Sequence, residues 1–160
     1  MIIDKYGTKR WRLNGKLHRE EAPAVEWADG DEEWWLNGKR HRVGDPAVEF
    51  TNGNKVWWLN GKRHREYITA IEWANGNKFW YLDGKLHREY GPAVEWVIGH
   101  KEWYLAGKLH REDGPAVEYA NRHKLWYLNG RKFETKEDWF ESLNEEYKMK
   151  VLFSDNFMNG

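Results

Sequence analysis

The sequence contains no cysteine, only four prolines and no formal net charge. The absence of cysteine excludes disulfides and thiolate chemistry and fits a reducing compartment. Its 26 basic residues balance 26 acidic residues, which argues against binding to the phosphates of duplex nucleic acid. No apolar run is long enough to cross a bilayer, and residues 1–5 have no signal-peptide core. We therefore expect a cytoplasmic protein without a transmembrane segment.

Aromatic residues are abundant instead, and they recur with the rest of the chain at a fixed interval. The unit is clearest in residues 101–122, which read KEWYLAGKLHREDGPAVEYANR. One leucine of the unit returns every 23 positions without an insertion, at Leu13, Leu36, Leu59, Leu82, Leu105 and Leu128. Six registers of this kind indicate a repeat array.

Each repeat carries two turn signals between runs of β-forming residues. Asp29-Gly30 separates residues 24–28 from residues 31–36, and Asn37-Gly38 precedes residues 39–42. Both dipeptides tolerate the positive φ angles that two-residue hairpin loops require. The sequence therefore predicts an all-β repeat, an elongated and twisted antiparallel meander of β-hairpins.

Two-residue loops would also fix which side chains share a face of the sheet. Counting from Asp29-Gly30 places Val25 opposite Trp34, and counting from Asn37-Gly38 places Trp35 opposite Arg40. The expected apolar face carries Val25, Trp27, Trp34, Leu36 and His41. The expected second face carries Ala24, Glu26, Glu33, Trp35, Arg40 and Arg42.

The two ends of the array differ from its middle. Residues 1–8 fit the unit poorly and are expected to pair with residues 9–14 as a degenerate cap. We therefore assign residues 1–133 to the array and residues 134–160 to a C-terminal helical cap. In the cap, Thr135 has the position of an N-cap and residues 144–146 could begin a second helix that runs through Phe153, followed by a frayed end.

The unit resembles the MORN (membrane occupation and recognition nexus) repeat over about residues 9 to 133. Residues 80–99 and 103–121 carry the shared features: the Gly-Lys-x-His run, a second glycine turn and the 23-residue period. The chain is most similar to the MORN-like variant of bacteriophage and bacterial proteins, which often end in a short helical tail. The resemblance implies the β-repeat fold, and a phage-encoded protein would act in the cytoplasm of its host. One departure is an arginine where the usual unit has glycine after the histidine, at Arg42, Arg65, Arg88 and Arg111.

Histidine also recurs, at His18, His41, His64, His87 and His110. Equivalent residues two strands apart lie about 10 Å from each other, too far to share a zinc ion bound at about 2.0–2.1 Å. We expect each ring to pack beside its cross-strand tryptophan and to bond a backbone or carboxylate partner. No metal site or cofactor is predicted.

Catalysis requires one asymmetric group of side chains, whereas every candidate acid or base here is repeated. The sequence also has no Gly-x-Ser-x-Gly motif and no Walker loop. We therefore predict that the protein is not an enzyme.

The residues favoured for binding are the aromatic and arginine columns of the second face. Arginines beside aromatic rings can hold protein side chains, bases or sugars, although the same contacts can be purely structural. The candidates are Trp35, Trp58, Tyr81, Tyr104, Tyr127, Arg42, Arg65, Arg88 and Arg111, together with Ile68. Ile68 and Val43 lie where the repeat is irregular, and they add apolar surface that could mark a partner or dimer patch, with drift of the repeat as the alternative.

Three functions remain for such a protein. The first is a non-enzymatic scaffold that binds another protein through this face, and the phage-like resemblance suggests an accessory role that acts on a host factor. The second is a protein that sequesters a nucleotide or signalling molecule between Trp and Arg side chains, at the interface of a homodimer or within one chain. The third is a structural spacer without a ligand.

Overall fold

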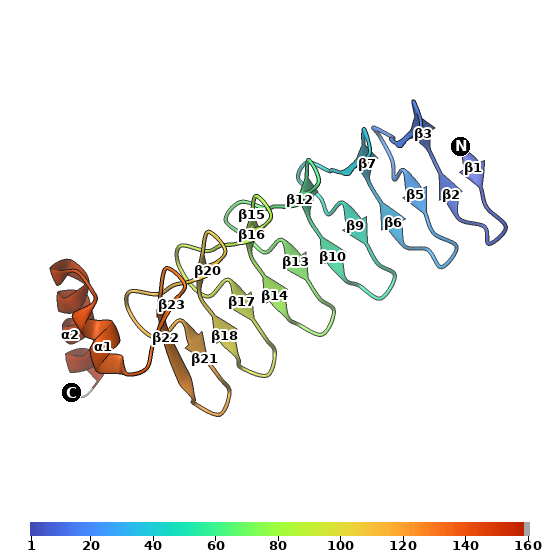
Figure 1. The fold of residues 1–160 in the computed structure, drawn as a ribbon. Coiled ribbons are helices and arrows are strands. Elements are labelled where there is room, and N and C mark those ends of the chain that lie inside the picture. The colour runs from blue at the N-terminus through green and yellow to red at the C-terminus, as the bar shows by residue number, and fades with distance from the viewer. Residues whose placement is uncertain (159–160) are drawn as a thin grey trace. The chain divides into compact units, whose positions relative to one another are not determined.

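The computed structural model describes residues 1–158 and divides into two compact units, Met1–Lys85 and a second unit that begins at Leu86. Both are built from short antiparallel hairpins, and two helices follow the last hairpin (Figure 1). Among the described residues, thirteen strands pair in one long antiparallel sheet, eight of them in the first unit and five in the second, and we call these the long-sheet strands. The other strands form two-stranded sheets, which we call ribbons. The predicted fold class, a repeated β-hairpin meander with a short helical end, is confirmed.

The first unit repeats a long hairpin and a short ribbon. Its long-sheet strands are β1 (Ile2–Ile3), β2 (Lys9–Arg10), β5 (Val25–Glu26), β6 (Glu32–Glu33), β9 (Val48–Glu49), β10 (Lys55–Val56), β13 (Ile71–Glu72) and β14 (Lys78–Phe79). The ribbons pair β3 (Arg12–Leu13) with β4 (Lys16–Leu17), β7 (Trp35–Leu36) with β8 (Lys39–Arg40), and β11 (Trp58–Leu59) with β12 (Lys62–Arg63). The ribbon strand β15 (Tyr81–Leu82) follows, and β16 (Lys85–Leu86) spans the boundary.

The second unit continues the same pattern and ends in helices. Its long-sheet strands are β17 (Val94–Glu95), β18 (Lys101–Glu102), β21 (Val117–Glu118), β22 (Lys124–Leu128) and β23 (Arg131–Phe133), and its ribbon pairs β19 (Tyr104–Leu105) with β20 (Lys108–Leu109). Helix α1 covers Lys136–Glu141 and helix α2 covers Glu145–Met158. The boundary expected at residue 133 is where the strands give way to helices.

The ribbon turns have the predicted register, but the long hairpins do not. Asn37 and Gly38 both have positive φ, and Trp35 lies opposite Arg40. At the other turn only Gly30 has positive φ, and the Trp27 N–H bonds the Asp31 carbonyl at 2.9 Å. The loop is therefore three residues long, a tight turn closed by a left-handed glycine. Val25 lies opposite Glu33, not Trp34, so the predicted register is wrong by one residue.

This shift changes which columns share a face. In the first unit each strand that leads into a ribbon is interrupted at the first tryptophan of the repeat; for example, the Trp34 N–H bonds the Ala47 carbonyl at 2.8 Å where β6 gives way to β7. Directly opposed residues of an antiparallel pair point to the same side. Glu33 therefore joins Val25, and the indole N–H of Trp35 donates to its carboxylate at 2.7 Å. The expectation that Trp34 shares the face of Val25 is wrong.

Both faces of the first unit are consequently covered by side chains. On one side Val48, Val56 and Ile71 form a buried cluster beneath partly buried aromatic residues, which are Phe50, Trp58, Trp73, Phe79 and Tyr81. On the other side three alanines, Ala24, Ala47 and Ala70, are fully buried, and the three tryptophans Trp34, Trp57 and Trp80 are buried except for a small exposed fraction. The aromatic columns explain how so polar a chain, with mean hydropathy −0.99, buries a core.

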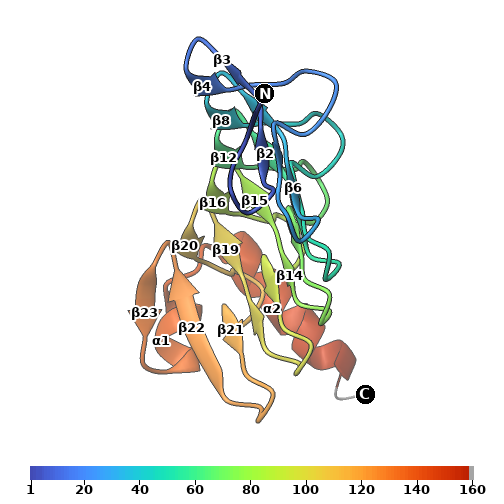
Figure 2. The same ribbon diagram turned by 90° about the vertical axis from the view of Figure 1, so that its right-hand side faces the viewer.

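The two ends are built largely as the sequence predicts. Strand β1 pairs with β2, which confirms the N-terminal half-unit. Thr135 Oγ1 accepts a hydrogen bond from the Asp138 N–H at 3.0 Å, and Asn144 Oδ1 accepts one from the Tyr147 N–H at 3.0 Å, which confirms both helix starts. Helix α1 lies against the β22–β23 hairpin (Figure 2). The end predicted at Phe153 is wrong, because α2 runs to Met158, and the remainder of the expected frayed end lies outside the described residues.

The last long hairpin contains a residue that the turn does not favour. Arg122 occupies the position held by Gly30 in the second repeat and has a φ of 69°. A non-glycine residue is strained in this left-handed region, so Arg122→Gly should raise the free energy of unfolding by about 0.5–1 kcal/mol. Urea unfolding of the two proteins measures the difference. Gly30→Ala, which places a Cβ 2.9 Å from Thr51 Cγ2 at a φ of 94°, is the control and should destabilise.

Candidate ligand-binding face

The arginines predicted as binding residues are used by the fold itself. Each guanidinium lies over a tryptophan of the buried column, at 3.9 Å for Arg42 over Trp34 and 3.8 Å for Arg65 over Trp57. Its Nη1 also donates to a backbone carbonyl four residues on and to a glutamate, as Arg42 does to Pro46 and, at 2.6 Å, to Glu49. The prediction that these arginines share a face with the Trp35 column is therefore wrong.

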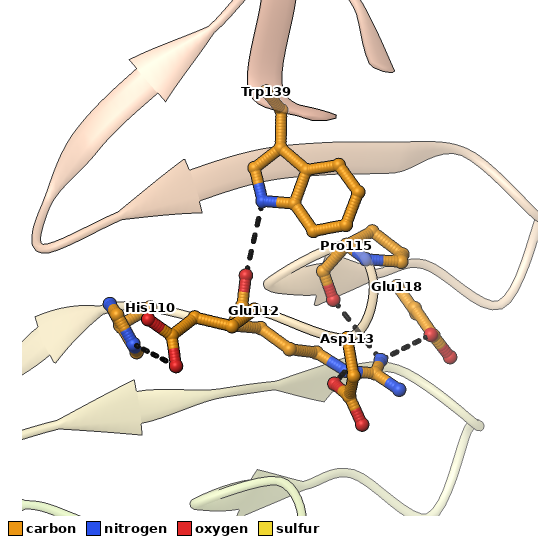
Figure 3. Close-up of polar contacts among 7 residues, drawn as sticks. His110, Glu112, Asp113, Pro115, Glu118 and Trp139 are labelled. Atoms are coloured by element: carbon orange, nitrogen blue, oxygen red, sulfur yellow. Dashed lines mark hydrogen bonds and ion pairs between the residues drawn. The ribbon is translucent and has the colours of Figure 1, made fainter. Parts of the chain in front are cut away.

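Arg111 shows the same arrangement in the second unit (Figure 3). Its Nη1 donates to the Pro115 carbonyl at 3.2 Å and to Glu118 at 2.8 Å, and its Nε donates to Asp113 at 2.7 Å. Its own carbonyl accepts the indole N–H of Trp139 at 3.1 Å. With every one of these groups engaged, Arg111 has a structural role.

The carboxylates of this face also have partners within the fold. A hydrogen bond from Lys9, with a further contribution from Arg19, holds the pKa of Glu26 below its ordinary value of 4.5 although burial acts in the opposite direction. Their charges are neutralised in the repeat, so this face offers little free charge to a ligand.

The opposite side of the first unit has a different arrangement, which we call the aromatic face. It consists of the valine and isoleucine cluster, the tryptophan column at its ribbon edge and the two arginines of the ribbons. Its aromatic and basic members are Trp35, Arg40, Trp58, Arg63 and Tyr81. Trp35, Arg40, Trp58 and Arg63 belong to the ribbons β7–β8 and β11–β12, and Tyr81 belongs to β15; these ribbon strands line one edge of this unit (Figure 1).

Rings and guanidinium groups alternate along the aromatic face. Arg40 lies 5.0 Å from the Trp35 ring centre and 5.4 Å from that of Trp58. Arg63 lies 5.3 Å from the Trp58 ring centre and 5.4 Å from that of Tyr81. Each cation therefore stands between two aromatic side chains of neighbouring repeats, a favourable cation–π geometry.

Arg40 already holds a carboxylate. Its Nε and Nη2 donate to the two oxygens of Glu33 at 3.2 and 3.3 Å. The indole N–H groups of Trp35 and Trp27 donate to the same carboxylate at 2.7 and 3.3 Å. Glu33 is only 8% exposed and is thus a buried anion with four donors.

Arg63 has the same surroundings without the carboxylate. Val56 stands where Glu33 stands 23 residues earlier. Within the described part of the chain, the Arg63 side chain makes only its two aromatic contacts, and the indole N–H of Trp58 has no acceptor. Arg63 is exposed and Trp58 is half-buried. These donors are available to a ligand.

The sequence predicts three members of this site but not its cations. Trp35, Trp58 and Tyr81 are among the predicted binding residues, whereas Arg63 is not and Arg40 is predicted only to lie on the second face. The signal lay in the departures from the repeat: arginine occupies this position in two units, and leucine occupies it in three others, at Leu17, Leu86 and Leu109.

In the second unit the residues opposite the predicted tyrosines are not arginines. Leu109 lies opposite Tyr104, whose hydroxyl donates to Glu102 at 2.8 Å. Lys132 lies opposite Tyr127 and donates to Glu134 at 3.0 Å. The Tyr104 hydroxyl is therefore bonded within the fold, and the lysine opposite Tyr127 is paired with a glutamate.

The irregular loops of the first unit are exposed. Val43 is 76% exposed, Ile68 is 49% exposed and Tyr67 is 95% exposed. The Ile68 N–H bonds the Glu66 carbonyl at 2.8 Å, and Tyr67 between them has a φ of 62°, which is unusual for a bulky residue. The expected apolar surface at Val43 and Ile68 is present.

The five histidines that recur with the repeat bond the backbone of the next repeat, one of the partners expected for them. Each Nδ1 accepts the backbone N–H of a turn residue 19 positions on, for example His41 from Asn60 at 3.2 Å and His87 from Ala106 at 3.0 Å. Among the residues that the structure describes, no three His, Asp or Glu side chains are close enough to hold a metal ion.

The helical end carries a separate surface depression of about 250 Å³. It is lined by Lys136, Glu137, Phe140, Glu141, Val151 and Leu152. Within residues 1–158 no helix combines the length and apolar character needed to span a membrane.

Comparison of the chain with models of known protein families gives no match, and no curated protein sequence matches it either.

Proposed function

We propose that this MORN-like repeat protein is a non-enzymatic binding module whose aromatic face contacts another protein. The observation that supports this proposal is the exposed Arg63 between Trp58 and Tyr81, with free donors above a buried apolar cluster. Tryptophan, tyrosine and arginine are the residue types that dominate the energetics of protein interfaces. Because the repeat resembles that of phage proteins, we propose that the partner is a host protein and that binding occurs in the host cytoplasm.

A photocrosslinking experiment tests this function. Tyr81 is replaced by a photoreactive phenylalanine analogue, and the protein is irradiated in the cells that produce it. We expect one discrete cross-linked protein from position 81 and a marked loss of it when Arg63→Ala is added. Glu49, which lies on the opposite face and bonds Arg42, is the control position and should give no such product. Equal products from both positions, or none from position 81, would contradict the proposal.

Sequestering of a small planar anion is the second candidate function, because a ring could stack on Tyr81 while its charged group meets Arg63. A panel of nucleotides would then raise the unfolding temperature at millimolar concentration. A panel without any stabilisation, together with a protein cross-link, favours the protein partner. A spacer would give neither result.

A further inference from the structure

We propose that Arg63 and Trp58 form a receptor for a carboxylate group of the partner protein, a glutamate or aspartate side chain that takes the place Glu33 takes one repeat earlier. This inference rests on the proposed function, and it names the chemistry of the contact. The arrangement of a guanidinium group between two aromatic rings occurs twice in the first unit, at Arg40 and at Arg63. At Arg40 it binds a carboxylate of the protein itself, which shows how a carboxylate could be bound at Arg63.

The filled copy defines the ligand. At Arg40 the bound group is a carboxylate that accepts from both Nε and Nη2 of one guanidinium and from the Trp35 indole N–H. A carboxylate matches the planar fork of arginine with two parallel hydrogen bonds. The equivalent donors in the next repeat are those of Arg63 and Trp58, in the same ribbon register, since Trp58 lies opposite Arg63 as Trp35 lies opposite Arg40.

The vacant copy differs at two positions in ways that open the site. Val56 is shorter than glutamate and supplies no acceptor, and Phe50 replaces Trp27, so one of the four donors is absent. Val56 is 7% exposed and forms an apolar floor with Val48 and Ile71. The stem of a partner's acidic side chain would contact this floor while its carboxylate meets Arg63.

The charge of the surroundings also favours an acidic group. With Arg40 neutralised by Glu33, Arg63 is the uncompensated cation of the stack. An acidic segment of a partner protein is therefore the complementary occupant.

Side-chain NMR tests the receptor directly. The Nε–H signals of Arg40 and Arg63 and the indole N–H signals of Trp35 and Trp58 are assigned with single substitutions to lysine and phenylalanine. Potassium acetate is then titrated against potassium chloride at constant ionic strength. We expect saturable shifts for Arg63 and Trp58 and none for Arg40 and Trp35, whose acceptor is already in place.

Two variants and a second anion make the result decisive. In Val56→Glu the built-in carboxylate should move the Arg63 and Trp58 signals toward those of Arg40 and Trp35 and remove the response to acetate. Val56→Met, of similar size but uncharged, should keep the response. Inorganic phosphate should shift the same signals less than acetate, and a stronger response to phosphate would overturn the assignment to a carboxylate. Equal acetate shifts at Arg40 and Arg63 would overturn the receptor itself.

The outcome is separable from that of the cross-linking experiment. A cross-link from position 81 without an acetate response would leave the protein-binding function and remove the carboxylate receptor. An acetate response without a cross-link would assign the receptor to a free small carboxylate and overturn a partner protein as the source.

Discussion

Replacing Trp139 with alanine should destabilise the second unit by about 3–5 kcal/mol, the range for removal of a large buried aromatic side chain. Trp139 is fully buried, its ring centre lies 4.6 Å from that of Trp126, and its indole N–H bonds the Arg111 carbonyl. It joins α1 to the last hairpin and to the arginine loop of the preceding repeat. Amide hydrogen exchange measures the effect, and α1, α2 and β23 should lose protection first.

The matched control is Trp139→Phe. Phenylalanine keeps most of the apolar contact but leaves the Arg111 carbonyl without its donor, so about 1–2 kcal/mol should be lost. Protection of the amides between Lys9 and Val56 should stay unchanged in both variants, because each repeat contacts only its neighbours. Equal losses in the two variants would show that the hydrogen bond outweighs the packing, contrary to this prediction.

The repeat and its turns could be predicted from the sequence, but the register of one turn could not. Asp29-Gly30 is compatible with a two-residue loop, in which both residues have positive φ, and with a three-residue loop, in which only the glycine does. The second form occurs here, and a hydrogen bond from the Asp31 N–H to Asp29 Oδ1 supports it. This choice depends on local bonding that a residue pattern does not distinguish.

A shift of one residue then moved entire columns between faces. Trp34 and Trp35 are adjacent and chemically identical, so no property of either residue reveals which one faces the arginines of the Arg42 column. The interruption of the strand at Trp34 determines it, since the chain there leaves the long sheet for the ribbon. The binding candidates Trp35, Trp58 and Tyr81 were predicted from the sequence, and their true cations were not.

The two arginine columns illustrate how one residue type has two roles in the same repeat. Arg42 and its equivalents contact a tryptophan ring and donate to a backbone carbonyl and a glutamate, so their role is to stabilise the fold. Arg40 and Arg63 occupy a position that is leucine in three other repeats and lysine, Lys132, in the last. In a repeat array the residues that occur in every unit form the scaffold. Residues that differ between units, such as Arg40 and Arg63, are therefore the ones that can give a single location its own binding site.

Adjacent tryptophans should therefore respond differently to the same substitution. Trp57 is 6% exposed, carries Arg65 over its ring and donates its indole N–H to the Gly44 carbonyl at 3.2 Å. Trp57→Ala should cost about 3–4 kcal/mol, whereas Trp58→Ala, at a half-buried site, should cost about 1–2 kcal/mol. Urea unfolding of the two variants measures the difference.

The binding readout should show the reverse order. Trp58→Ala removes one wall and one donor of the Arg63 site, so the cross-link from position 81 should fall at least about tenfold in a protein that remains folded, as truncation of an interface hot spot does. Trp57→Ala, measured at a temperature where it is still folded, should retain the cross-link, because its ring lies on the opposite face with Arg65. If Trp58→Ala proves as destabilising as Trp57→Ala and leaves the cross-link intact, the aromatic face is structural and the binding site lies elsewhere.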